Sequence, residues 1–169
     1  MARRRHESPV LTIMLFALLV AGIAASLLDP AGIVVRDDMA VELTSLSGAS
    51  LVLFIVGMGM IVVGGTIRLV AIATLKENFS GALRIREGHT LIKNGIYGKV
   101  RHPAYLGAIL FFLGLPIMLS SPVGFAVMVL LVPVLLHRID LEERMLIGRF
   151  GAEYEDYMRS SKRLIPFLY

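Results

Sequence analysis

The sequence of 169 residues contains no cysteine, which excludes disulfide bonds and thiol chemistry. It also has no P-loop, and Gly57 and Gly59 lie inside an apolar run, which leaves no βαβ unit to hold a dinucleotide. His89, His102 and His137 lack the close spacing of zinc ligands, and we predict that the protein binds no metal. The Gly-x-Ser-x-Gly signature of serine hydrolases is missing as well.

Charged residues are scarce at 18%, whereas 56% of the residues are hydrophobic and the mean hydropathy is +0.76. A soluble domain of this size does not carry so much apolar surface, so the composition predicts an integral membrane protein. Apolar segments occupy residues 10–28, 51–67 (continuing to 75), 104–119 and 123–136. We predict an all-α fold with about four transmembrane helices and a cytoplasmic amphipathic helix near the C-terminus. The net charge of +4 gives no reason to expect a nucleic-acid partner.

The third and fourth apolar segments are separated only by Ser120-Ser121-Pro122, which predicts the tip of a tight helical hairpin. Pro116 and Pro133 are expected to bend its two arms. Because both arms are short, a hairpin that dips into the membrane and returns is the alternative to two full spans.

Basic residues gather before the first apolar segment, between the second and third, and after the fourth, whereas residues 29–50 contain Arg36 alone. This alternation predicts that the N-terminus, the C-terminus and the two polar regions around the hairpin are all cytoplasmic. Arg68 is expected to extend from the second span to the interface. The cluster Arg3–Arg5 before an apolar run also fits a signal peptide, but the length of that run favours an uncleaved span. We therefore divide the chain into two N-terminal spans, 1–75, and a region that carries the chemistry, 76–169.

The segment 95–107, GIYGKVRHPAYLG, places cationic, aromatic and proline residues at the start of an apolar helix. Pro103 suits the first helical turn, and His102 before it favours an extended backbone. A helix N-terminus at the membrane surface favours an anionic group, which predicts one wall of a ligand site. Each aromatic or cationic residue taken singly also fits a role as an interfacial anchor.

The segment 137–161, HRIDLEERMLIGRFGAEYEDYMRSS, has apolar residues at helical spacing, which predicts an amphipathic helix against the membrane surface. Arg138 and Glu142 are four residues apart and share a face, where we expect both to meet a ligand. Glu143 and Arg144 are expected on a solvated face, and Gly151 is expected to end or kink the helix.

Several of these motifs occur together in one known family. The order His89-Thr90-Leu91-Ile92, Gly95-x-Tyr97, RHPxYxG at 101–107, RxxxEE at 138–143 and FGxxYxxY at 150–157 resembles the isoprenylcysteine carboxyl methyltransferases, and in particular their short prokaryotic relatives. The similarity covers about residues 78–168. The RHPxYxG element is also shared with phospholipid N-methyltransferases and some membrane reductases. The first two apolar segments match only in hydrophobicity.

The resemblance implies that the protein binds S-adenosyl-L-methionine without a soluble nucleotide-binding domain. It implies that Arg138 holds the carboxylate of a lipophilic or prenylated substrate, which enters sideways from the membrane lipid. At Ala82 the sequence departs from the eukaryotic members, which carry a glutamine in the cofactor pocket. The implied cofactor contacts are His89, Thr90, Leu91, Ile92, Tyr97, His102, Pro103, Ala104, Tyr105 and Glu142.

A carboxylate is ionised at neutral pH, so its methylation needs alignment and exclusion of water rather than a general base. Phospholipid or amine N-methylation is the alternative, and it needs a base, for which Glu143 and His102 are candidates. A non-catalytic membrane protein whose basic loops bind anionic lipid is the third hypothesis. The sequence predicts neither the natural methyl acceptor nor the oligomeric state.

Overall fold

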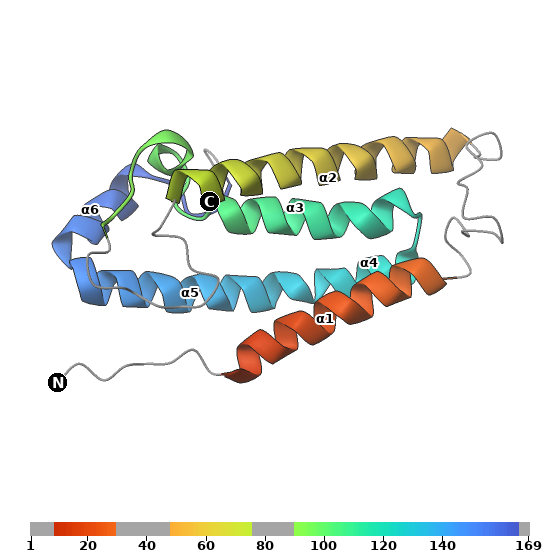
Figure 1. The fold of residues 1–169 in the computed structure, drawn as a ribbon, viewed down its shortest axis with the longest axis horizontal. Helices are drawn as coiled ribbons and strands as arrows, with labels where there is room; N and C mark the ends of the chain where they lie inside the picture. Colours follow the sequence, from red (N-terminus) through yellow and green to blue (C-terminus); the bar gives the residue numbers. More distant parts are fainter. Residues whose placement is uncertain (1–8, 30–47, 76–89, 166–169) are drawn as a thin grey trace.

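The computed structural model describes residues 9–29, 48–75 and 90–165, which are mostly helical (Figure 1). Within these residues the only β-type pairing is one parallel bridge between Val100 and Lys162. The elements in chain order are α1 (Pro9–Leu28), α2 (Gly48–Leu75), the 3-10 turn η3 (Gly95–Gly98), α3 (Pro103–Met118), α4 (Pro122–Val129), α5 (Leu131–Phe150) and α6 (Ala152–Ser160).

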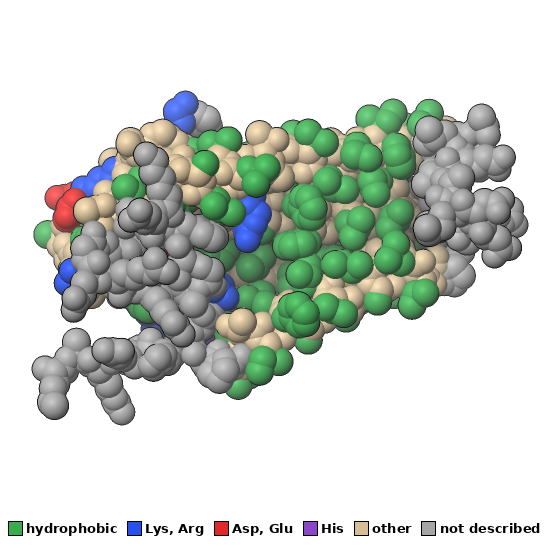
Figure 2. All heavy atoms as spheres, viewed as in Figure 1, with side chains coloured by type: hydrophobic (Ala, Val, Ile, Leu, Met, Phe, Trp, Pro, Cys, Tyr) green, Lys and Arg blue, Asp and Glu red, His purple; other side chains and the backbone are tan. Residues whose placement is uncertain are grey.

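Three helical stretches are long and apolar enough to cross a membrane: Val10–Leu28, Gly48–Leu75 and Pro122–Phe150. Apolar side chains cover the outside of the helical body, and charged ones gather toward the end that carries α6 (Figure 2). The prediction of an all-α, multi-pass membrane protein is therefore confirmed. Of the four predicted spans, α3 is the short one, because its 16 residues extend only about 24 Å.

Helices α2 and α3 lie side by side and pack closely against each other (Figure 1). Glycines spaced seven apart line the seam, Gly57 and Gly64 on α2 and Gly107 and Gly114 on α3. A Cβ atom at Gly64 would lie 2.6 Å from the backbone nitrogen of Phe111. Lipid chains are as apolar as the side chains, so helices in a membrane associate through such close backbone packing.

The predicted hairpin turn is present between α3 and α4. Ser120 has a φ of 53°, and the Ser121 side chain caps α4 by accepting a 2.9 Å hydrogen bond from the Gly124 backbone N–H. Asp29, at the end of α1, accepts bonds from the Ser121 hydroxyl (2.7 Å) and the Val123 N–H (3.0 Å). This buried carboxylate attaches α1 to the hairpin tip, and α1 packs along α4.

The fourth apolar segment is not separate from the amphipathic helix that follows it. Helix α4 ends at Val129 and α5 begins at Leu131, four and two residues before Pro133. A proline has no N–H for the carbonyl four residues earlier, which in this case is that of Val129, so the helix is interrupted at this point. Pro116, in contrast, lies inside an uninterrupted α3. Helix α5 then continues through Arg138 to Phe150.

Candidate active site

The start of α3 and the segment after α6 are held together by backbone hydrogen bonds. The N–H groups of Arg101 and His102 donate to the carbonyls of Lys162 (2.8 Å) and Arg163 (3.1 Å), and the Lys162 N–H donates to the carbonyl of Lys99 (2.9 Å). We call residues 161–165 the closing segment. Because of this pairing, the start of α3 and the closing segment lie together toward the end of the molecule that carries α6 (Figure 1).

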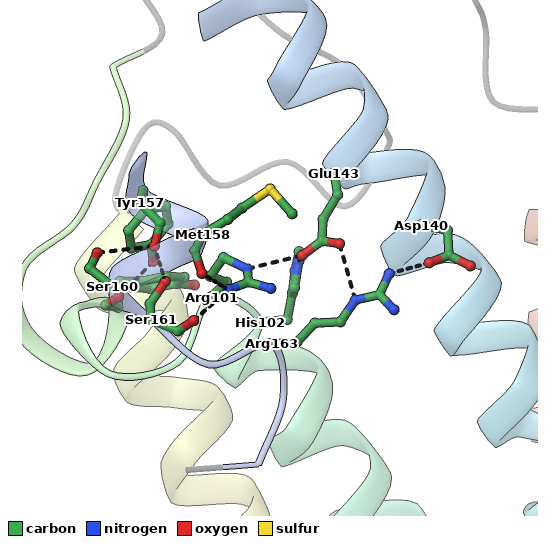
Figure 3. A network of polar contacts seen from close by, with 10 residues as sticks. Arg101, His102, Asp140, Glu143, Tyr157, Met158, Ser160, Ser161 and Arg163 are labelled. Atoms are coloured by element: carbon green, nitrogen blue, oxygen red, sulfur yellow. Dashed lines mark hydrogen bonds and ion pairs between the residues drawn. The ribbon is translucent and has the colours of Figure 1, made fainter. Parts of the chain in front are cut away.

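Glu143 on α5 is the centre of a buried ionic cluster (Figure 3). Its Oε1 lies 3.0 Å from Nε of Arg101 and 3.2 Å from Nε2 of His102, and its Oε2 lies 3.1 Å from Nε of Arg163. Arg163 also contacts Asp140, one turn earlier on α5. We define this ionic cluster as these five residues. It fixes both the closing segment and the His102 ring against α5.

The expectation that Glu143 faces solvent is therefore wrong, since only 7% of the residue is exposed. Arg144, its neighbour, is exposed as expected. A single carboxylate surrounded by three cationic or hydrogen-bonding side chains can be buried, because its charge is compensated within the protein. All three partners, Arg101, His102 and Arg163, are far from Glu143 along the chain.

A second set of contacts joins Arg138, Glu142 and Tyr105. The Tyr105 hydroxyl on α3 donates a 2.8 Å hydrogen bond to Oε2 of Glu142, and Nε of Arg138 donates to the same hydroxyl over 3.1 Å. Arg138 is 8% exposed, so its guanidinium is directed into the protein rather than into solvent. The prediction that Arg138 and Glu142 share one face of a helix is confirmed, and Tyr105 is the residue between them.

Tyr97, in η3, is buried against α2 and the start of α3. Its ring packs with Ala71 and Ala104, and Ile92 packs against that group. Its hydroxyl lies 3.4 Å from the Ala71 carbonyl oxygen. Burial, and then the nearby charge of Glu142, raise the pKa of Tyr97, so this hydroxyl is protonated and able to donate at physiological pH.

Helix α6 contacts the backbone of Tyr97. The Tyr157 hydroxyl donates a 2.6 Å hydrogen bond to the Tyr97 carbonyl, and burial raises the pKa of Tyr157 to about 12. Tyr154, one turn earlier, is 1% exposed and packs edge-on against the Tyr157 ring. Its hydroxyl has no hydrogen-bond partner within the described part of the chain.

The structure brings most of the predicted cofactor contacts to this end of the molecule. Pro103 is the first residue of α3 and is buried. Thr90 is exposed and Leu91 is half-buried, and both precede η3 in the chain. His89 lies outside the described residues. The predicted residues that lie together are Ile92, Tyr97, His102, Pro103, Ala104, Tyr105, Arg138 and Glu142.

Two residues of the ionic cluster, Asp140 and Arg163, were not among those that the sequence predicted for the site. Arg101 lies within the segment 95–107, which was predicted as one wall of it. The adjacent glutamates at 142–143 were a further signal, because in a helix their side chains point in different directions and so need separate partners. Arg68 on α2 reaches the start of α3, where its NH1 donates a 3.0 Å hydrogen bond to the Ala104 carbonyl. The expectation that it extends to the membrane interface stays a prediction.

These features define a class of protein: a helical membrane protein with a polar, largely buried site at the end of its apolar helices. The family model for the isoprenylcysteine carboxyl methyltransferases (ICMT) matches residues 55–148. The chain belongs to this family.

Individual relatives agree with the family match. The chain is 34% identical over 116 residues to a probable protein-S-isoprenylcysteine O-methyltransferase of Oryza sativa subsp. indica, which covers 67% of this chain and 61% of the relative. It is 37% identical over 117 residues to protein-S-isoprenylcysteine O-methyltransferase A of Arabidopsis thaliana, covering 66% of this chain and 58% of that protein. The chain thus spans about three-fifths of the length of these relatives.

A solved structure extends the similarity to the whole chain. The eukaryotic intramembrane Ras methyltransferase ICMT superposes with a TM-score of 0.65 at 26% identity, and the match covers 98% of this chain and 55% of that one. The arrangement of helices described above is therefore similar to that of a known intramembrane methyltransferase.

Proposed function

We propose that this protein is an S-adenosyl-L-methionine-dependent methyltransferase that esterifies the carboxylate of a lipophilic, isoprenylcysteine-like substrate. The observation that carries the proposal is the placement of Arg138 and Glu142 on successive turns of α5, joined through the Tyr105 hydroxyl. Arg138 suits an anionic substrate, and its neighbour Glu142 suits a cationic or hydroxyl group. Membership of the family supports the reaction type.

The residues at this end fit the cofactor chemically. Glu142 offers a carboxylate to an ammonium group or to ribose hydroxyls, and it is held in place by Tyr105. Tyr154 adds a buried hydroxyl with no protein partner within residues 9–29, 48–75 and 90–165. Tyr97, His102, Pro103, Ala104 and Tyr105 would form the walls of the site, with Thr90, Leu91, Ile92 and His89 as further predicted contacts. When bound, S-adenosyl-L-methionine supplies a methyl group on a positively charged sulfur.

Arg138 would hold the substrate carboxylate. A guanidinium offers two parallel N–H groups, which match the two oxygens of a carboxylate. Nε of Arg138 already donates to Tyr105, which fixes the orientation of the guanidinium plane. The carboxylate is ionised at neutral pH and attacks without losing a proton, so the protein's task is to align it and to exclude water.

The ionic cluster disfavours N-methylation as the alternative. That reaction releases a proton, and Glu143 was a candidate to accept it. In the structure both Glu143 oxygens are occupied by Arg101, His102 and Arg163, so this carboxylate serves to hold the site together. O-methylation needs no such base.

Apolar side chains on the outer faces of α1, α2 and α4 suit contact with lipid, and a lipophilic substrate would reach the site from the bilayer (Figure 2). We propose that the site and both termini are cytoplasmic, because the basic residues gather at that side.

Methyl transfer from radiolabelled S-adenosyl-L-methionine tests this function. The purified protein in lipid nanodiscs would be given an S-prenylated cysteine derivative with a free carboxylate, and the control acceptor would be the same molecule with its carboxylate blocked as an amide. We expect transfer only to the free acid, and release of labelled methanol on mild alkaline hydrolysis. Label that resists alkali, or equal transfer to the amide, would contradict O-methylation.

A further inference from the structure

Tyr154 differs from the other tyrosines in the described part of the chain. The hydroxyls of Tyr97, Tyr105 and Tyr157 each donate to a protein oxygen, at 3.4, 2.8 and 2.6 Å respectively. The Tyr154 hydroxyl has no such partner there, although the residue is only 1% exposed and cannot be satisfied by bulk solvent. A buried polar group without a hydrogen bond is costly, and native proteins keep few of them.

The surroundings of this hydroxyl are those of the proposed site. Burial raises the pKa of Tyr154, the charge of Glu143 raises it further, Arg101 lowers it, and Glu142 raises it again. The hydroxyl therefore keeps its proton and is available as a hydrogen-bond donor within the electrostatic range of Glu143, Arg101 and Glu142.

The Tyr154 ring is held in this orientation. Helix α6 is anchored through the Tyr157 hydroxyl, which donates to the Tyr97 carbonyl, and through an exposed ion pair of 2.8 Å between Lys93 and Glu153. Tyr154 also packs edge-on against Tyr157, with ring centroids 5.8 Å apart. The hydroxyl thus stays buried even though no protein group in the described residues accepts a hydrogen bond from it.

We propose that Tyr154 is a cofactor-binding residue whose hydroxyl donates a hydrogen bond to the amino-acid carboxylate of bound S-adenosyl-L-methionine. This inference rests on the proposed function. The ammonium and carboxylate groups of that ligand are attached to one carbon atom, so their partners must be close neighbours. Glu142 suits the ammonium, Tyr154 suits the carboxylate, and Arg101 supplies a positive charge nearby.

The test compares two ligands that differ in the amino-acid group. S-adenosylhomocysteine carries it and methylthioadenosine lacks it, so only the first can reach the Tyr154 hydroxyl in the proposed way. In calorimetry on the full chain in detergent, Tyr154→Phe should bind S-adenosylhomocysteine about tenfold more weakly and methylthioadenosine as the unsubstituted protein does. Without ligand, the unfolding temperature of Tyr154→Phe should be unchanged or higher, because the Tyr154 hydroxyl makes no hydrogen bond to the described part of the protein.

Tyr157→Phe is the matched control, since it removes a hydroxyl from the same helix one turn away. That hydroxyl bonds the Tyr97 carbonyl, so this variant should unfold at a lower temperature while the ratio of the two ligand affinities stays the same. The inference is overturned if Tyr154→Phe binds S-adenosylhomocysteine normally, or if it loses affinity for both ligands equally. If the unsubstituted protein binds neither ligand, the proposed function fails as well.

Discussion

The hydroxyl of Tyr105 donates a 2.8 Å hydrogen bond to Oε2 of Glu142, and this contact joins α3 to α5 inside the site. The same hydroxyl accepts a bond from Arg138, so a single phenol lies between a residue suited to the substrate and a residue suited to the cofactor. A change in the position of Arg138 or Glu142 would therefore alter the contacts of the other through Tyr105. The roles proposed for Arg138 and Glu142 can still be separated, because each makes a different prediction for binding and turnover.

Arg138→Ala should abolish most methyl transfer while leaving the binding of S-adenosylhomocysteine within a few-fold of the unsubstituted protein. The reason is that the guanidinium is assigned to the substrate carboxylate, and a charge-assisted hydrogen bond contributes about 1.5–3 kcal/mol. The measurement is kcat/KM together with calorimetry. Arg138→Lys keeps the charge but loses the planar fork, and it should recover only part of the activity. A collapse of cofactor affinity in Arg138→Ala would show that the role is misassigned.

Glu142→Gln, in contrast to Arg138→Ala, should weaken the binding of the cofactor. It keeps an acceptor for the Tyr105 hydroxyl but removes the negative charge proposed to meet the cofactor, so the affinity for S-adenosylhomocysteine should fall by about ten-fold or more. Titration calorimetry measures this directly, with thermal unfolding as a check that the variant is folded. Unchanged affinity would remove Glu142 from the cofactor site.

Glu143→Gln should destabilise the protein strongly, because it leaves Arg101 and Arg163 near one another without the carboxylate between them. Breaking a buried ion pair by removing one partner costs about 3–5 kcal/mol. Glu153→Gln is the control, since its pair with Lys93 is exposed and such pairs contribute about 0–1 kcal/mol. Thermal unfolding in detergent should separate the two variants clearly. Equal unfolding temperatures would mean that the ionic cluster does not hold the site together.

Gly64→Ala should weaken the packing of α2 on α3. The new Cβ would lie 2.6 Å from the Phe111 nitrogen and 2.7 Å from the Gly107 carbonyl oxygen, and both are backbone atoms that move only with the helix. Overpacking of this kind costs about 1–3 kcal/mol. Gly59→Ala, on the same helix, meets nothing within 4 Å and should be neutral or slightly stabilising. The two unfolding temperatures form the test, and a neutral Gly64→Ala would argue against the glycine seam.

The parts of this fold that could be predicted are those encoded locally. The apolar runs predicted the helices, and Ser120-Ser121-Pro122 predicted the hairpin turn. The spacing of Arg138 and Glu142 predicted that they share one face of a helix. Gly151 has a φ of 54° and ends α5, as its position after an amphipathic run predicts.

The burial of Glu143 could not be predicted in this way. It depends on Arg101 and Arg163, which reach α5 only because residues 99–102 pair with residues 161–163. That pairing consists of backbone hydrogen bonds, which leave no pattern in the side chains. The Tyr154 hydroxyl, which has no hydrogen-bond partner among the described residues, could not be predicted either, since burial is a property of the assembled structure.

The pairing of residues 99–102 with residues 161–163 also has a consequence for biosynthesis. Residues 161–163 follow the described apolar helices α1 to α5, and proteins are synthesised from the N-terminus. The helices are thus available for membrane insertion before Arg163 has emerged from the ribosome. Until then, Glu143 lacks one of its counter-ions. Insertion of the helices can therefore precede assembly of the ionic cluster, so a nascent chain already resident in the bilayer would still lack this part of its folded structure.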